Sequence, residues 1–128
     1  MIYVDTSVLL AQLLAEDRVP APSLWRETLV ASRLAEYELF TRLHARKLAA
    51  SHGEAARALI SRLALVELAP PVLARALEAF PVPVRALDAL HLASMHFLRG
   101  LGREISLATF DERLAVAARK LGIKLARV

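Results

Sequence analysis

The sequence contains no cysteine among its 128 residues. This absence excludes a disulfide framework and any metal site built on thiolates, so a bound metal ion would need oxygen or histidine ligands. It also fits a reducing compartment, and we expect the protein to be cytoplasmic. Aromatic residues are scarce as well, at 5% of a chain that is 56% hydrophobic. The core must therefore be built mainly from Leu, Val and Ala.

A long uninterrupted hydrophobic segment is also missing. Charged residues break every apolar stretch well before the roughly 20 residues that a membrane-spanning helix needs. No basic segment precedes the apolar run at the N-terminus, and Asp5 interrupts that run, so we expect neither a signal peptide nor a membrane partner. The chain length is typical of one domain, which we place at residues 1–128.

The excess of basic residues is modest, with 17 Lys and Arg against 13 Asp and Glu and a formal net charge of +4. Such a charge is compatible with a polyanionic partner, but it is also common among proteins that bind no nucleic acid. The charge alone therefore leaves the class of partner open.

What the chain does contain is an alternation of strand and helix patterns. We predict strands at 2–4, 29–31, 64–68, 105–109 and 123–128, and helices at 8–15, 33–50, 54–63, 72–80, 86–99 and 112–120, with a break at 51–53. Alternation of this kind with short connections favours an α/β fold in which a central parallel sheet is flanked by helices on both faces.

The opening stretch holds the first candidate functional residue. Three β-forming residues, 2–4, run directly into Asp5, Thr6 and Ser7, and a helical pattern follows at once. This order indicates a buried strand that delivers an acid to a strand-to-helix turn. Ligands of open α/β sheets bind outside the carboxyl ends of the strands, where Asp5 is predicted to lie. A simple helix cap explains the same pattern.

Two further aspartates occupy comparable positions. Asp111 follows another predicted strand, so it can converge with Asp5 at one edge of a parallel sheet. Asp88 lies in the first turn of a predicted helix. Both have an alternative explanation, because carboxylates at these positions also stabilise a helix N-terminus as caps or through the helix dipole.

A fourth acid comes from the second long helical segment, where Glu36 and Glu38 compete. Residues two apart on a helix point to nearly opposite sides. Glu36 shares its side with Arg33, which is a ready ion-pair partner, whereas Glu38 lies on the more apolar flank with no obvious cation. We therefore choose Glu38. Carboxylates brought close together repel one another unless a cation lies among them, and an all-oxygen set suits Mg²⁺ or Mn²⁺. Such an ion supports phosphodiester hydrolysis.

These residues match a known family. The chain resembles PIN-domain ribonucleases, of the short kind that forms the VapC toxin of VapBC toxin-antitoxin pairs. The resemblance spans almost the whole chain, and the motifs that carry it are, in order, Ile2-Tyr3-Val4-Asp5-Thr6-Ser7, Ser32 with Glu38-Leu39 six residues later, Arg85-Ala86-Leu87-Asp88-Ala89-Leu90-His91-Leu92-Ala93, and Ala108-Thr109-Phe110-Asp111-Glu112-Arg113-Leu114.

The resemblance implies a PIN-like three-layer α/β/α fold and an endoribonuclease that depends on Mg²⁺ or Mn²⁺. It also implies RNA as the substrate, a VapB-like antitoxin as a partner, and a homodimer. Asp5, Glu38, Asp88 and Asp111 fall on the four acidic positions of the family, as metal ligands and catalytic residues. By the same resemblance, Thr6, Ser7 and Thr109 are expected to orient the carboxylates or their waters.

Three arginines are candidates for RNA contacts. By resemblance, the helix that carries Arg42 and Arg46 borders the RNA groove, although such residues more often face solvent. Arg85 precedes the helix of Asp88 and is expected to touch an RNA phosphate or to pair with an acid of the site. For His91, one turn after Asp88, packing within a Leu-rich helix is the preferred interpretation over catalysis.

Two other functions compete with the ribonuclease. The first is a catalytically silent PIN-like module that only binds nucleic acid or protein, which missing acids would favour. The second is an aspartyl-phosphate phosphatase, which also places an acid after the first strand. That chemistry needs a second aspartate two residues later, where this chain has Ser7.

Overall fold

Five parallel strands form the centre of the protein in the computed structural model, which describes residues 1–128. Their spatial order is β3-β2-β1-β4-β5. Six α-helices and one short 3₁₀ helix, η1, connect them. The elements are β1 (Ile2–Val4), α1 (Thr6–Leu14), η1 (Pro22–Arg26), β2 (Leu29–Ser32), α2 (Arg33–Ala45), α3 (Ala49–Ile60), β3 (Ala64–Val66), α4 (Pro70–Ala76), α5 (Ala86–Gly100), β4 (Ser106–Ala108), α6 (Glu112–Lys120) and β5 (Lys124–Leu125).

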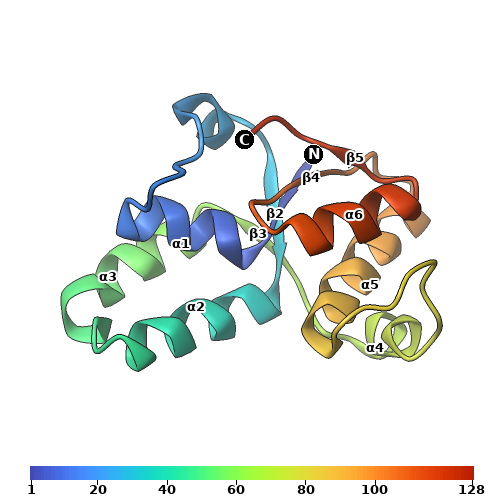
Figure 1. Cartoon of the computed structure of the whole chain (residues 1–128), viewed down its shortest axis with the longest axis horizontal. Coiled ribbons are helices and arrows are strands. Elements are labelled where there is room, and N and C mark those ends of the chain that lie inside the picture. Colours follow the sequence, from blue (N-terminus) through green and yellow to red (C-terminus); the bar gives the residue numbers. More distant parts are fainter.

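The helices cover both faces of the sheet and make three layers. Figure 1 shows the sheet nearly edge-on, with α1, α2 and α3 on one side and α4, α5 and α6 on the other. The predicted α/β/α architecture with a central parallel sheet is therefore confirmed. None of the helices is both long enough and apolar enough to cross a membrane.

Successive side chains of the strands point alternately into two separate hydrophobic cores, one on each face of the sheet. Tyr3 and Leu107 point into the cluster that packs against α4, α5 and α6, whereas Val4 and Ala108 point into the cluster beneath α1, α2 and α3. All four are buried. Alternate side chains of a strand point to opposite faces of the sheet, so both faces of β1 and β4 are apolar, as expected for strands covered on both sides.

The register of the sheet determines which residues meet at its carboxyl edge. Val4 pairs with Ala108 across β1 and β4, so the next residues, Asp5 and Thr109, leave the sheet side by side. Tyr3 pairs with Val30 on the other neighbour, β2, which ends at Ser32. The strand ends of β1, β2 and β4 therefore reach one edge together.

Polar side chains at these strand ends begin the helices. Asp5, Ser32 and Asp111 are the N-caps of α1, α2 and α6, and each accepts a hydrogen bond from a backbone N–H of the first turn. Gly122 follows α6 with φ 78°, a conformation that glycine adopts without steric cost. The capping roles that the sequence offered for Asp5 and Asp111 are confirmed.

The boundaries between α2, α3 and α4 differ from the prediction. Helix α2 ends at Ala45 and the chain turns at Lys47, with φ 57°, so the predicted break at 51–53 is wrong. Helix α3 runs through those residues, because Gly53 costs a helix only about 1 kcal/mol relative to alanine and α3 packs against α1 and α2. Helix α4 starts at Pro70, since proline lacks only an N–H that is unpaired in a first turn. Helix η1 was not predicted.

Two leucines allow a matched test of the core. Leu107 lies in β4 and is fully buried, whereas Leu77, just after α4, is 90% exposed. We expect Leu107→Ala to lower the free energy of unfolding by about 2–5 kcal/mol, because it leaves a cavity beside α5 and α6. Leu77→Ala should change it by no more than about 0.5 kcal/mol. Urea denaturation of both variants measures the difference, and equal losses would contradict this packing.

Candidate active site

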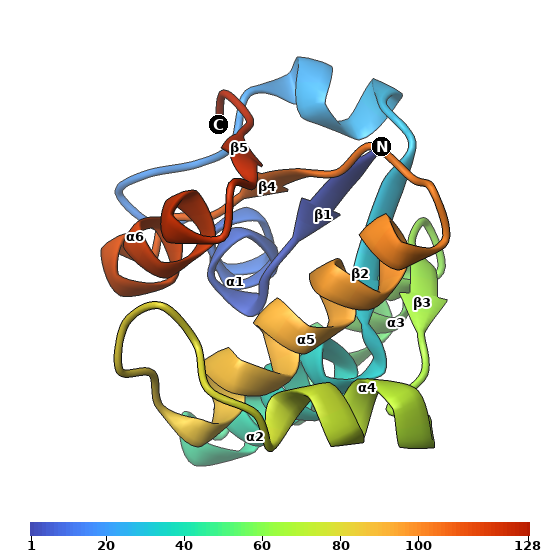
Figure 2. The same cartoon turned by 90° about the vertical axis from the view of Figure 1, so that its right-hand side faces the viewer.

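A cavity of about 610 Å³ opens at the carboxyl edge of the sheet. The four acids singled out in the sequence, Asp5, Glu38, Asp88 and Asp111, all line it. They come from the end of β1, from α2, from the first turn of α5 and from the N-terminus of α6. Figure 2 shows α5 running beside the lower ends of β1 and β2, where these elements approach one another.

Asp5 is the most enclosed of the acids, with 4% of its surface exposed. Its Oδ1 accepts hydrogen bonds from Ser7 Oγ at 2.6 Å and from the backbone N–H of Val8 at 3.4 Å. Its Oδ2 accepts one from Thr109 Oγ1 at 2.8 Å. Burial raises the pKa of the Asp5 carboxyl, although the hydrogen bonds from Ser7 and Thr109 oppose that shift.

Glu38 is held at one oxygen only. Oε1 accepts a hydrogen bond from Thr6 Oγ1 at 2.8 Å and lies 2.7 Å from His91 Nε2, whereas Oε2 accepts none from the protein. Partial burial raises the pKa of Glu38, whereas the hydrogen bonds from His91 and Thr6 lower it. The second effect is larger, so the net shift of the pKa is downward. Glu38 therefore remains ionised at neutral pH with one oxygen free.

His91 extends this contact into the core. Its Nδ1 lies 2.7 Å from Tyr3 Oη, and the two rings meet edge to face at 83°. His91 is buried, as the packing interpretation requires, but its contact with Glu38 was not predicted. Burial raises the pKa of the Tyr3 phenol far above its ordinary value, so the phenol keeps its proton.

The guanidinium group of Arg85 forms ion pairs with both Asp88 and Asp111. Arg85 Nε donates to Asp88 Oδ2 at 3.2 Å, and its Nη2 lies 3.7 Å from Asp111 Oδ2. Asp111 Oδ1 caps α6 by accepting from the backbone N–H groups of Arg113 and Leu114, so the cap and a place in the cavity coexist. Arg85 thus pairs with acids, one of the two roles expected of it.

Other basic side chains line the cavity. Arg42 and Arg46 face it, as the sequence suggested, and Arg46 lies 3.7 Å from Glu16. Arg18 was not predicted: its guanidinium lies 4.8 Å from the centroid of the Phe110 ring, and Nη2 donates to the Phe110 carbonyl at 3.0 Å. Arg18 follows α1 in a loop with no motif, and only the folded chain brings it to the residue before Asp111.

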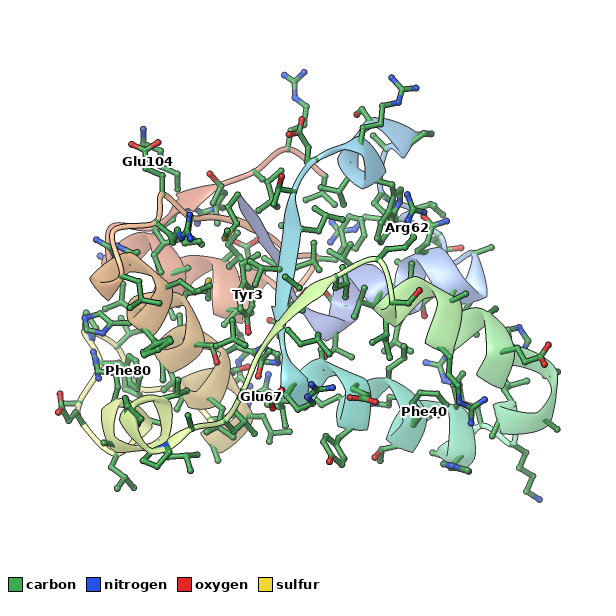
Figure 3. All side chains as sticks on the ribbon, turned by 180° about the vertical axis from the view of Figure 1, so that it is seen from behind. Tyr3, Phe40, Arg62, Glu67, Phe80 and Glu104 are labelled. Carbon is green, nitrogen blue, oxygen red and sulfur yellow. The ribbon has the colours of Figure 1, made fainter.

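The choice between the two glutamates of α2 agrees with their positions. Glu36 forms an ion pair with Arg33 at 2.9 Å, and Arg33 also binds Glu67 at the end of β3, which Figure 3 labels. Glu36 and Glu67 do not line the cavity, whereas Glu38 does.

The residues of the cavity fit a hard divalent cation in their chemistry, because the acids offer only oxygen ligands. Glu38 Oε2 and Asp88 Oδ1 accept no hydrogen bond from the protein and are available as donors. In the present arrangement, however, no three Asp, Glu or His side chains form a group that could hold a metal ion, and Arg85 lies between Asp88 and Asp111. A bound ion would therefore need local movement of the side chains.

Comparison with known proteins identifies the family of the chain and the structures that its fold resembles. Residues 2–120 match the sequence profile described as PIN domain. The chain is 33% identical to ribonuclease VapC47 of Mycobacterium tuberculosis, over 95% of this chain and 93% of that protein. Among solved structures, the fold is similar to the M. tuberculosis toxin VapC20, described as cleaving the sarcin-ricin loop, with a TM-score of 0.69, 19% identity and full coverage of both chains. It is also similar to a toxin-antitoxin complex from Klebsiella pneumoniae, with a TM-score of 0.67, 15% identity and 94% coverage of each chain.

The buried charge of Asp5 makes a prediction about pH. Because the pKa of Asp5 is raised on folding, its ionised form destabilises the protein at pH values above that pKa. The penalty shrinks as pH falls through this pKa and is gone below the ordinary pKa of 3.8 that the carboxyl has in the unfolded chain. Asp5→Asn removes the charge. We expect its melting temperature, relative to that of the unsubstituted protein, to be higher at pH 8 than at pH 4, measured in EDTA by calorimetry. A relative stability that falls with rising pH would contradict the assignment.

Proposed function

Because this chain belongs to the PIN domain family and is a homologue of a VapC ribonuclease, we propose that it is an endoribonuclease that acts as the toxin of a toxin-antitoxin pair in the cytoplasm. The reaction is hydrolysis of phosphodiester bonds in RNA. The observation that carries the proposal is the convergence of Asp5, Glu38, Asp88 and Asp111 on one cavity at the carboxyl edge of a parallel sheet.

The four carboxylates are the proposed catalytic residues and ligands for Mg²⁺ or Mn²⁺. Such an ion, when bound, would lower the pKa of a water molecule and stabilise charge on the phosphate and the leaving oxygen. The chain itself supplies the orientation. Ser7 and Thr109 fix both oxygens of Asp5, and Thr6 fixes one oxygen of Glu38. These three hydroxyls are neutral donors, so they orient the acids without cancelling their charge.

The basic residues of the cavity suit an RNA substrate. Arg42 and Arg46 line the same cavity as the acids, and so does Arg18, beside Phe110. Guanidinium groups bind phosphate oxygens through charge-assisted hydrogen bonds, so these side chains are placed to hold the RNA backbone around a scissile phosphate. Arg85 is available for the same role only when it leaves Asp88 and Asp111.

The proposed protein partners are inferred from the proteins that this chain resembles. The similarity to a toxin-antitoxin complex supports a VapB-like antitoxin as the binding partner of this chain. We also propose a homodimer, on the resemblance to VapC toxins alone.

One observation favours the alternative of a binding module without catalysis. The guanidinium of Arg85 occupies the space between Asp88 and Asp111, and no three potential ligands are grouped for a metal ion. Titration with Mn²⁺ separates the two functions, because a ribonuclease of this kind binds the ion at millimolar concentration or below and a silent module does not. The phosphatase alternative has less support, since Ser7 stands where a second aspartate is needed and donates to Asp5.

The ribonuclease makes a direct prediction about the acids. Asp5→Asn and Asp88→Asn should each lower RNA cleavage at least about 100-fold, the scale expected when charge stabilisation is removed from a transition state. The matched control is Glu104→Gln, at an exposed acid labelled in Figure 3 that precedes β4, whereas the site lies after the other end of that strand. Cleavage of a fluorescent RNA with and without EDTA measures the effect. Full activity of both Asn variants in clean preparations would show that the active-site assignment is wrong.

The toxin role makes a separate prediction in cells. Induced expression of the chain should arrest bacterial growth, and Asp88→Asn at equal protein levels should not, because growth arrest requires cleavage of cellular RNA. Colony counts after induction, with protein level checked by blotting, measure the difference. Arrest by the Asn variant would show that the toxicity does not come from this site.

A further inference from the structure

A chain of hydrogen bonds connects the hydrophobic core to the cavity. It runs from Tyr3 Oη to His91 Nδ1 at 2.7 Å, and from His91 Nε2 to Glu38 Oε1 at 2.7 Å. Tyr3 and His91 are 0% and 3% exposed. The three residues belong to β1, α5 and α2, and Figure 3 shows Tyr3 on the face of the sheet that α5 covers. One chain of hydrogen bonds therefore joins three elements that are far apart in sequence and ends at the carboxylate of Glu38.

The order of donors along this chain follows from Tyr3. A buried phenol keeps its proton at neutral pH, and Tyr3 Oη lies 2.7 Å from His91 Nδ1, so the phenol donates to that nitrogen. A neutral imidazole that accepts at Nδ1 carries its own hydrogen at Nε2. His91 therefore donates from Nε2 to Glu38 Oε1.

The two oxygens of Glu38 are left in different states. Oε1 accepts from His91 and from Thr6 Oγ1, which satisfies both of its lone pairs. Oε2 accepts nothing from the protein, and Glu38 lines the cavity. A free glutamate side chain samples many rotamers, so two donors on one oxygen restrict where the other oxygen can lie.

Packing alone does not require this arrangement. Ser94, also buried in α5, satisfies its hydroxyl by donating to the carbonyl of Leu90 in its own helix at 2.8 Å. His91 instead uses both ring nitrogens on side chains of other elements, and one of these is an acid of the cavity. No buried side-chain nitrogen or oxygen in the protein lacks a partner, so the chain of bonds is complete.

We propose that His91, held in place by Tyr3, is a positioning residue that fixes Glu38 through Oε1 and leaves Oε2 free to bind a metal ion. The proposal rests on the proposed function, because it assigns how one ligand of that site is oriented. His91 lines the cavity but is almost fully buried, and both of its ring nitrogens are occupied by Tyr3 and Glu38, so it acts through Glu38. Its contribution is to supply an N–H at one fixed point, which keeps Glu38 in a single conformation before the ion binds.

Two amide substitutions separate the two ends of the imidazole. The amide nitrogen of Gln reaches about the position of His Nε2, whereas that of Asn reaches only about that of Nδ1. His91→Asn should therefore lose the donor to Glu38, and His91→Gln should keep it. We expect His91→Asn to weaken Mn²⁺ affinity on the order of tenfold, with a similar fall in kcat and little change in KM for RNA, and His91→Gln to retain most of both. Electron paramagnetic resonance of free Mn²⁺ measures the affinity without reference to activity.

A double-mutant cycle shows whether His91 acts through Glu38. In a Glu38→Gln background, His91→Asn should cause no further loss of Mn²⁺ affinity or kcat, because the carboxylate it orients is already gone. Met95→Ala is the control for general loss of core packing, since Met95 is buried in the core one turn further along α5 and does not line the cavity. It should lower stability and leave Mn²⁺ affinity unchanged.

The outcomes distinguish this proposal from the function on which it rests. Equal Mn²⁺ affinities of the Asn and Gln variants, or additive effects of the Glu38 and His91 substitutions, overturn the positioning role. If Asp5→Asn and Asp88→Asn lose cleavage in the same experiments, the ribonuclease stands and only the role of His91 is wrong. If Asp88→Asn keeps full activity, the site itself is wrong, whatever the His91 variants do.

Discussion

The buried carboxylate of Asp5 is the group on which the rest of the site depends. An ionised acid can remain buried only if hydrogen-bond donors surround it, and burial still raises its pKa. The donors come from two places, Ser7 and Val8 at the start of α1 and Thr109 after β4. Because the two strands are adjacent and parallel, one register supplies both sets of donors. A shift of one residue between β1 and β4 would move Thr109 out of reach and leave one oxygen of Asp5 unpaired.

Much of this arrangement could be predicted from local sequence. Strands β1 and β4 are each followed, within three residues, by an aspartate that begins a helix, Asp5 and Asp111, so the signal is local in the sequence. Alternation of strands and helices then predicted the parallel sheet, which brings those ends to one edge. Glu38 was preferred to Glu36 because Arg33 offers Glu36 a partner, and the structure has that ion pair. The family resemblance agrees with the profile match over residues 2–120.

The parts that sequence did not predict depend on contacts between distant elements or on weak local preferences. The bond between His91 and Glu38 joins residues 53 apart, and neither side chain carries a local signal for the other. Arg18 reaches Phe110 from a loop with no motif. The break predicted at 51–53 was wrong because a local preference was overridden. A glycine costs a helix about 1 kcal/mol, which is small compared with the free energy gained by burying a whole helix face.

The two halves of the cavity differ in how their acids are held. Asp5 and Glu38 are fixed by hydroxyl groups and an imidazole, which orient a carboxylate without cancelling its charge. Asp88 and Asp111 share Arg85, whose side chain is 61% exposed, and such an ion pair contributes at most about 1 kcal/mol. Separation of Arg85 from these acids therefore costs little, whereas movement of Asp5 or Glu38 would break several buried hydrogen bonds. Any rearrangement that groups the four acids around a cation must take place mainly on the side of Asp88 and Asp111.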